Sequence, residues 1–170
     1  GNGINKLLER ALKSHEKTEE KVIRMRSHFV PYYDVHNADL SNPYPGIVSL
    51  LEDLQAKGIL IALASNKYQE ATVKLVKQYF PNIDFVEILG QREGINVKPD
   101  PSIVFDILQK ANLSKENVLY VGDSGVDMQT AINAGVDAVG VTWGFRPRAE
   151  LESFRPMGLI DKAEDLLEFI

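Results

Sequence analysis

Short apolar runs alternate with amphipathic helical segments from about residue 45 onward, and this alternation is the strongest constraint on the fold. Residues 59–64 form a continuous apolar run, which is typical of a strand buried on both faces of a parallel sheet. Further strands are predicted over 85–89, 118–121, 138–142 and 159–160, and helices over 47–57, 69–79, 101–111, 127–134, near 148 and from about 163. This order predicts an α/β fold in which helices cover both faces of a parallel sheet.

The first part of the chain shows helical spacing only. Apolar residues recur at helical intervals from Ile4 to Leu12 and again from Val22 to Phe29. Asn, Asp, Ser, Pro and Gly residues then cluster over 36–46, as expected for a connecting loop. We therefore expect two units, a helical module over 1–40 and an α/β core over 41–170.

Composition narrows the classes of partner. The 170 residues carry a formal net charge of −5, so we expect no basic face for nucleic acid or an anionic membrane. No apolar run is long enough to cross a membrane, and there is no cysteine for a disulfide or a thiolate metal site. We expect a cytoplasmic protein.

Polar side chains follow the predicted strands at the point where each strand ends. Ser65 and Asn66 follow the first run, Lys98 lies in the next loop, and Asp123 and Asp127 follow the third run. Because ligands bind beyond the carboxyl ends of parallel strands, these side chains are expected to meet at one site. Hydroxyl and amide groups can hold phosphoryl oxygens, a lysine neutralises them, and carboxylates suit Mg²⁺. The set predicts a site for a phosphate and a divalent cation.

Each of these residues also has a simpler explanation. Ser65 and Asn66 could cap the following helix, and Lys98 could be a solvated loop residue. Asp123 could be a helix N-cap, with Asp127 on an exposed helix face. The functional hypothesis therefore depends on the whole set and its order along the chain.

The same positions lie in segments that resemble motifs two, three and four of the haloacid dehalogenase superfamily, in its phosphoglycolate phosphatase-like branch. The matching segments are Pro43-Tyr44-Pro45-Gly46, Ala64-Ser65-Asn66-Lys67, Lys98-Pro99-Asp100-Pro101, Val121-Gly122-Asp123-Ser124 and Val141-Thr142-Trp143-Gly144. The resemblance implies a Rossmannoid core with a helical cap, of which residues 1–40 are the later part. It also implies Mg²⁺-dependent hydrolysis of a small phosphorylated metabolite through an aspartyl-phosphate. In that scheme Ser65, the Asn66 backbone and Lys98 bind the phosphoryl group, Asp123 binds the metal and Asp127 supports the metal site.

The family's first motif, an Asp-x-Asp-Gly-Thr run that supplies the nucleophile and the general acid, has no match here. No Asp-x-Asp occurs in the 170 residues. In the family this motif ends a central strand between the strands that end near Ser65 and Asp123. Its absence would leave two inner sheet edges unpaired. We expect a stretch cut from a longer chain and inactive alone, with the sheet completed by the missing segment or another chain, or else closed up differently.

Two other classes of protein fit the sequence poorly, and three further functions fit it. A receiver domain has its acidic residues before its lysine, whereas Asp123 follows Lys98 here. A dinucleotide-binding fold requires a Gly-x-Gly-x-x-Gly run, and none occurs. A hexose-phosphate mutase or pyrophosphatase of the same superfamily stays open, as does a non-catalytic folding or binding fragment. The exact substrate is not specified by these motifs.

The remaining candidates have structural interpretations. His15 and His28 are expected at the surface or in packing, and His36 is expected to pack at the junction between the cap and the core. Trp143 is expected to pack rather than react. Arg146 follows a strand end and could meet a substrate anion, although a surface salt bridge is an equal alternative.

Overall fold

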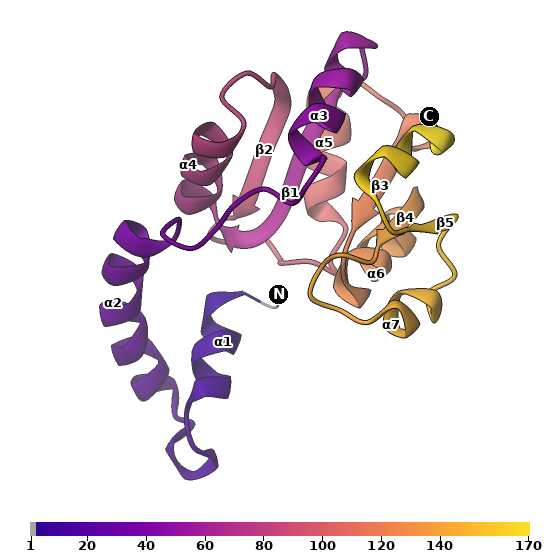
Figure 1. The fold of residues 1–170 in the computed structure, drawn as a ribbon. Helices are drawn as coiled ribbons and strands as arrows, with labels where there is room; N and C mark the ends of the chain where they lie inside the picture. Colours follow the sequence, from indigo (N-terminus) through magenta and orange to yellow (C-terminus); the bar gives the residue numbers. More distant parts are fainter. Residues whose placement is uncertain (1–2) are drawn as a thin grey trace.

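A computed structural model describes residues 3–170 and shows a helical hairpin projecting from an α/β core (Figure 1). The hairpin consists of α1 (Ile4–Ala11), a 3-10 turn η1 (Ser14–Glu16) and α2 (Glu19–His36). Thr18 caps α2 by accepting a hydrogen bond from the Lys21 amide. Among the described residues, no helix is long and apolar enough to cross a membrane.

The core alternates helices and strands as the sequence predicts. Its elements are α3 (Ile47–Ala56), β1 (Ile61–Tyr68), α4 (Gln69–Tyr79), β2 (Phe85–Gln91), α5 (Ser102–Ala111), η2 (Lys115–Asn117), β3 (Leu119–Gly122), α6 (Gly125–Ala134), β4 (Asp137–Val141), α7 (Arg148–Glu152), β5 (Gly158–Ile160) and η3 (Ala163–Phe169). All strand pairs are parallel, which confirms the expected α/β class.

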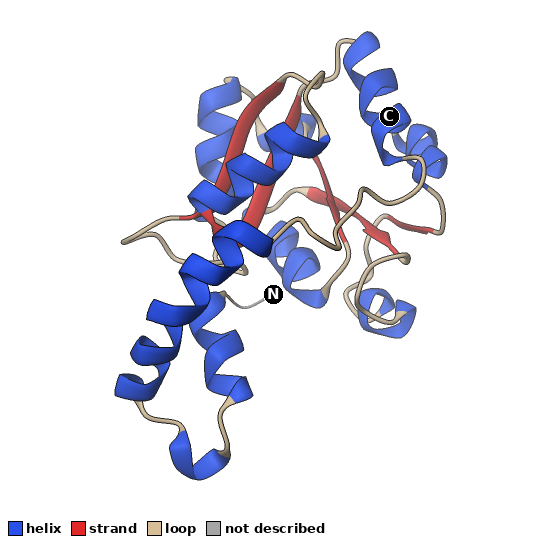
Figure 2. Ribbon diagram, turned by 60° about the vertical axis from the view of Figure 1, so that its left-hand side comes forward, coloured by secondary structure: helices blue, strands red, loops and turns tan. Residues whose placement is uncertain are grey.

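The sheet is divided into two parts. β1 pairs with β2, starting at Ile61 opposite Phe85. In the other part, β4 lies between β3 and β5, and the β3–β4 pair starts with Leu119 opposite Asp137. In the part of the chain that the structure describes, the inner edges of β1 and β3 pair with no strand, and Figure 2 shows the two groups of strands apart.

Each face of the divided sheet has its own buried cluster. The first joins α3, η3 and the strand residues that face them, and its buried members include Leu50, Leu54, Ile61, Val139, Val141, Ile160 and Leu166. The second joins α5, α6 and α7 on the other face, and its members include Leu89, Ile103, Val104, Met128, Ala131, Ala138 and Leu151. Adjacent residues of β4 point to opposite clusters, so helices cover both faces as expected for a buried parallel sheet.

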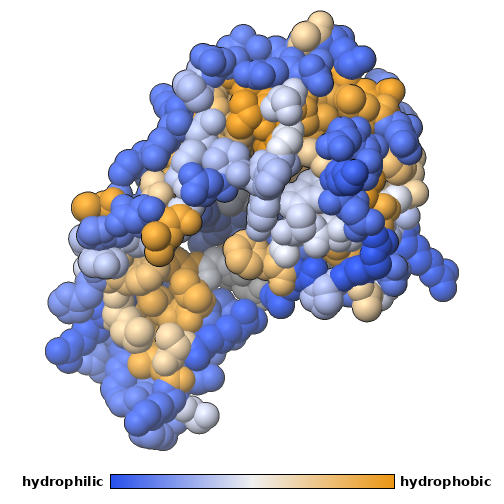
Figure 3. Space-filling view, in the orientation of Figure 1, coloured by the Kyte–Doolittle hydropathy of each residue, from blue (hydrophilic) through white to orange (hydrophobic). Residues whose placement is uncertain are grey.

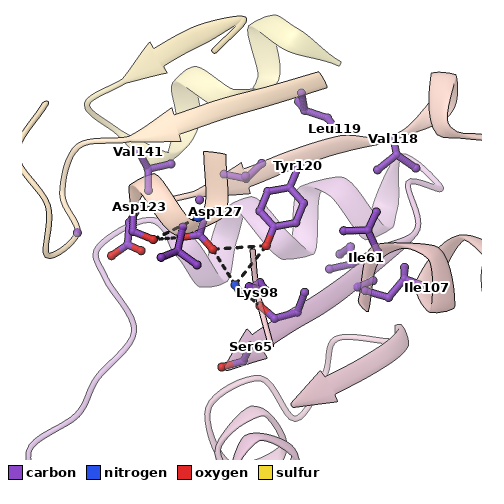
Figure 4. A pocket seen from close by; sticks show the side chains of 18 of the residues that line it. Ile61, Ser65, Lys98, Ile107, Val118, Leu119, Tyr120, Asp123, Asp127 and Val141 are labelled. Carbon is purple, nitrogen blue, oxygen red and sulfur yellow. Dashed lines mark hydrogen bonds and ion pairs between the residues drawn. The ribbon is translucent and has the colours of Figure 1, made fainter. Parts of the chain in front are cut away.

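A cavity of about 1210 Å³ lies between β1 and β3 and extends to the inner side of the hairpin. Its walls between the strands are largely apolar and include Ile61, Ile107 and Leu119 (Figure 4). Leu60 and Val121, which also line it, remain 57% and 41% exposed. Figure 3 shows apolar side chains at the surface of the hairpin and over the upper core, with a hollow between hairpin and core. The gap in the sheet is therefore open, not closed by rearrangement of the strands.

Most element bounds lie within two residues of the sequence-based expectation, and three elements differ in another way. β1 continues past residue 64 to Tyr68, because irregular pairing with β2 resumes at Gln91. The second helix of the hairpin, whose apolar spacing in the sequence ends at Phe29, runs through Pro31 to His36. Its last turn is supported by His36, whose ring lies 4.3 Å from that of Tyr32 and whose Nδ1 lies 2.7 Å from an Asp39 carboxylate oxygen. The last predicted helix is a 3-10 helix.

Two leucines give a matched test of the open gap. Leu54 is only 6% exposed, so Leu54→Ala should lower the free energy of unfolding by about 2–5 kcal/mol. Leu60 lines the gap and is 57% exposed, so Leu60→Ala should change that free energy by about 0.5 kcal/mol or less. Urea unfolding followed by circular dichroism measures both values. Equal losses would mean that the chain fills the gap in solution.

Candidate active site

The buried ammonium of Lys98 is the centre of the candidate site. Its Nζ lies 2.7 Å from Asp127 Oδ1, 2.9 Å from the Ala64 carbonyl oxygen and 3.2 Å from the Tyr120 hydroxyl. These partners come from α6, β1 and β3, so the ammonium joins both parts of the divided sheet (Figure 4). Lys98 is only 9% exposed, so its interpretation as a solvated loop residue is wrong.

Local structure holds Asp127 against Lys98. Ser124 is the N-cap of α6, and its hydroxyl also donates to Asp127 Oδ2 at 2.6 Å. A Cβ at Gly122 would collide with the Asp127 side chain, so this close approach requires glycine. Asp127 is 7% exposed, which overturns its interpretation as a residue on an exposed helix face.

The electrostatics favour the charged pair. Burial opposes ionisation of Asp127, but the Lys98 ammonium and the hydrogen bonds from Lys98 and Ser124 hold its pKa below the ordinary value. Burial also opposes the charge on Lys98, yet the Asp127 carboxylate and the hydrogen bonds to Asp127 and Tyr120 raise the pKa of Lys98 above its ordinary value. Burial raises the pKa of Tyr120, so its hydroxyl keeps its proton. The site therefore holds an ammonium and a carboxylate at neutral pH.

Ser65 and Asn66 do not cap α4, contrary to the simpler interpretation of the sequence. The N-cap residue is Tyr68, whose side chain makes no capping hydrogen bond. Instead the Asn66 side chain accepts from the Lys98 amide at 2.8 Å and donates to the Lys98 carbonyl at 3.0 Å. The Ser65 hydroxyl accepts from the Lys67 amide at 3.0 Å. Asn66 thus fixes the backbone that carries the central ammonium.

Asp123 presents a half-buried carboxylate to the same cavity. Its Oδ2 accepts from the Phe145 amide at 3.1 Å, and a Cβ at Gly144 would overlap the carboxylate. Ser124, not Asp123, is the N-cap of α6, so the cap interpretation of Asp123 is wrong. Ser65, Asn66, Lys98, Asp123 and Asp127, all predicted from sequence, line one cavity.

These residues fit part of a magnesium shell. Asp123 supplies the hard oxygen donor that Mg²⁺ prefers. Both oxygens of Asp127 are already bonded, one to Lys98 and one to Ser124. Within residues 3–170, no group of three or more His, Cys, Asp or Glu side chains could hold an ion. An octahedral shell at this position would need further oxygen atoms from the substrate, from water or from another segment.

Sequence reasoning missed Tyr120 and the contacts of the hairpin with the core. Tyr120 lies inside a strand, where nothing but its position opposite Lys98 marks it. The Tyr33 hydroxyl of α2 bonds to Lys67, and the Tyr68 hydroxyl bonds to Asp34. Lys74 also donates to the Asp34 carbonyl at 2.6 Å. Such partners lie 34 to 40 residues apart in the chain, beyond the reach of local patterns.

The remaining candidates have structural roles. Trp143 packs against the cluster that includes α3 and η3. Arg146 Nε lies 3.9 Å from Glu150, in the exposed salt bridge that was one of its two expected roles.

Comparison with known proteins assigns the class. The family model described as haloacid dehalogenase-like hydrolase matches residues 2–141. The chain belongs to this family of hydrolases. Its curated relatives include phosphoglycolate phosphatases of Vibrio cholerae, 31% identical over 100% of this chain and 77% of that protein, and of Mannheimia succiniciproducens, 28% identical over 100% and 79%.

Solved structures lead to the same branch. A crystal structure from Lactobacillus delbrueckii subsp. bulgaricus, assigned as a phosphoglycolate phosphatase, superposes with a TM-score of 0.87 at 33% identity and covers 100% of this chain and 79% of its own. One from Haemophilus somnus with the same assignment has a TM-score of 0.88 at 30% identity over 99% and 78%. Within the hydrolase family, the chain is a phosphatase of the phosphoglycolate phosphatase-like branch.

The Lys98–Asp127 pair gives a test of the site's cohesion. Lys98→Met should lower the free energy of unfolding by about 3–5 kcal/mol, because the variant leaves the Asp127 carboxylate buried without its cation. The double variant Lys98→Met with Asp127→Leu should regain at least half of that loss. Urea unfolding of the variants measures this coupling. If the loss in the double variant equals the sum of the losses in Lys98→Met and Asp127→Leu, the two side chains do not interact in solution.

Proposed function

We propose that these residues form the phosphoryl-binding and metal-binding part of a Mg²⁺-dependent phosphomonoester hydrolase that acts through an aspartyl-phosphate. The observation that supports this most directly is the meeting of Lys98, Asp127, Ser65 and Asp123 in one cavity at the carboxyl ends of β1 and β3. The names of the curated relatives point to phosphoglycolate, a small phosphorylated metabolite, as the substrate. The cytoplasmic location stays a prediction.

Each residue has a defined task in this proposal. The Ser65 hydroxyl and the Asn66 amide bind oxygens of the transferring phosphoryl group. The Lys98 ammonium stabilises the negative charge on those oxygens, and Asp127 holds the ammonium in place. Asp123 would hold Mg²⁺, which, when bound, supplies charge neutralisation and orients the phosphate.

The nucleophile comes from a segment outside the 170 residues. Among the described residues that line the cavity, Asp123 and Asp127 are the acidic ones at the carboxyl ends of the strands. Asp127 is bonded on both oxygens, and Asp123 is assigned to the metal. A further aspartate would attack phosphorus while the ester P–O bond breaks and a neighbouring acid protonates the leaving oxygen. Water then cleaves the acyl phosphate and releases inorganic phosphate.

The gap between β1 and β3 supports a place for that segment. Both strands direct their carboxyl ends at the site and offer unpaired inner edges in the described part of the chain. A parallel strand of about five residues, at ~3.3 Å per residue, would run between β1 and β3 along the length of the gap. Because Leu51 of α3 and Ile107 of α5 line opposite walls, its side chains should be apolar on both faces. Its carboxyl end would bring an aspartate beside Lys98.

A peptide complementation assay tests this function. The chain alone, with MgCl₂, should release phosphate from 2-phosphoglycolate no faster than buffer. A synthetic peptide of five alternating Val and Ile residues followed by Asp-Leu-Asp-Gly-Thr should bind and restore Mg²⁺-dependent release. Peptide binding is followed by fluorescence anisotropy and phosphate release by a colorimetric assay.

Two peptide controls separate binding from chemistry. A peptide with Asn for the first Asp should bind equally well without phosphate release. A peptide with Pro at the central apolar position should bind at least tenfold more weakly, because it loses a ladder hydrogen bond. Turnover by the chain alone would contradict the assignment of the nucleophile. Equal binding of the proline peptide would contradict insertion as a strand.

A further inference from the structure

Lys67 is a second cation in the cavity whose role the proposed function does not assign. It lies two residues after Ser65 in β1, and its amide donates to the Ser65 hydroxyl at 3.0 Å. The side chain is half-buried and lines the same cavity as Ser65, Lys98 and Asp123. This backbone bond links the position of Lys67 to the phosphoryl-binding hydroxyl.

The hairpin holds the Lys67 ammonium at the mouth of the site. The Tyr33 hydroxyl of α2 bonds to Nζ, which also lies 4.4 Å from the centre of the Tyr33 ring. Phe29 stacks on Tyr33 at 5.2 Å, and both rings line the cavity. Aromatic rings on one side and the strand on the other thus restrict the direction in which the ammonium can point.

The charge on Lys67 lacks an acidic partner among the residues that the structure describes. No carboxylate of residues 3–170 lies within 4.0 Å of its Nζ, in contrast to Lys98. The nearby Asp34 carboxylate accepts from the Tyr68 hydroxyl instead. A half-buried ammonium with only a neutral hydroxyl and a ring beside it favours an external anion.

The two lysines therefore divide the charge of the ligand. Lys98 faces the phosphoryl position but is largely neutralised by Asp127. Lys67 is free to neutralise a second acidic group, and Arg10 of α1 lines the same cavity. We infer that Lys67 binds the carboxylate of a small phosphorylated hydroxy acid and so selects the substrate. This inference rests on the proposed function, since it assumes that the phosphoryl group lies at Ser65 and Lys98.

A latch between the hairpin and the core is the alternative role for Lys67. The bond from Tyr68 to Asp34 and the bond from Lys74 to the Asp34 carbonyl already connect these parts. Loss of a latch would weaken every ligand of the cavity equally. Loss of a carboxylate partner would weaken only ligands that carry a carboxylate. The ratio of two affinities measured on one variant distinguishes the two roles.

The test uses the 170-residue chain with MgCl₂ and three probes: 2-phosphoglycolate, ethyl phosphate, which lacks the carboxylate, and inorganic phosphate. Isothermal titration calorimetry should show 2-phosphoglycolate bound about 10- to 100-fold more tightly than ethyl phosphate, as expected for a charge-assisted contact. Lys67→Gln should abolish this preference and leave the affinity for inorganic phosphate within about twofold. Lys67→Arg should keep most of the preference. Lys77→Gln, which removes an exposed lysine of α4, is the matched control and should change nothing.

The outcomes separate the two proposals. If the wild-type chain binds none of the three probes, the proposed function fails and this inference fails with it. If it binds phosphate but does not prefer 2-phosphoglycolate, the inference about Lys67 is overturned while the proposed function stands. The inference about Lys67 is likewise overturned if Lys67→Gln keeps the preference for 2-phosphoglycolate or lowers the affinity for both esters equally.

Discussion

Both the architecture and the site depend on the ion pair and the hydrogen bonds that the Lys98 ammonium makes. It bonds to the Ala64 carbonyl of β1, the Tyr120 hydroxyl of β3 and the Asp127 carboxylate of α6. These groups belong to the two separate parts of the sheet, so one buried cation connects them across the gap. Asn66 fixes the backbone of the same lysine from β1. The charge that we propose binds phosphate is thereby also the charge that holds the strand ends together.

The divided sheet explains how the described part of the chain can fold although the inner edges of β1 and β3 pair with no strand there. Each face has a buried cluster built from helices and strands on both sides of the gap, and Val139 and Leu151 are fully buried within them. Hydrophobic burial on the two faces can thus hold the halves without a central strand. The cost, within residues 3–170, is two unpaired inner edges beside exposed apolar residues such as Leu60 and Val121, a surface prone to pair with another strand.

Local sequence patterns predicted the elements well and the contacts of the site poorly. The helix predicted over 69–79 has the same bounds in the structure. The alternation of strands and helices predicted the α/β class because buried parallel strands have a distinctive composition. The same rule brought Ser65, Lys98 and Asp123 to one edge of the sheet. Taken alone, Asn66 was better explained as a helix cap, because its actual partner Lys98 lies 32 residues away. Tyr120 has the pattern of an ordinary strand residue.

The gap in the sheet was predicted from the resemblance to a family whose first motif has no match here. The pattern of these 170 residues alone would not have predicted it. The structure adds its consequence, two inner edges held apart by helices on both faces. It also shows that the hairpin contacts the site through Tyr33 and Lys67, which no spacing along the chain could indicate. Residues that act across elements are visible only once the fold brings those elements together.

Amide hydrogen exchange along the strands tests the central claim most directly. β4 is paired on both sides, whereas β1 and β3 are each paired on one side among the described strands. The account predicts slow exchange for the β4 amides of Val139 and Gly140, which have a strand on each side, and fast exchange for alternate amides of β1 and β3, those that face the gap. Uniform protection of β1 and β3 at the level of Val139 and Gly140 would show that the sheet is closed in solution and would contradict the account.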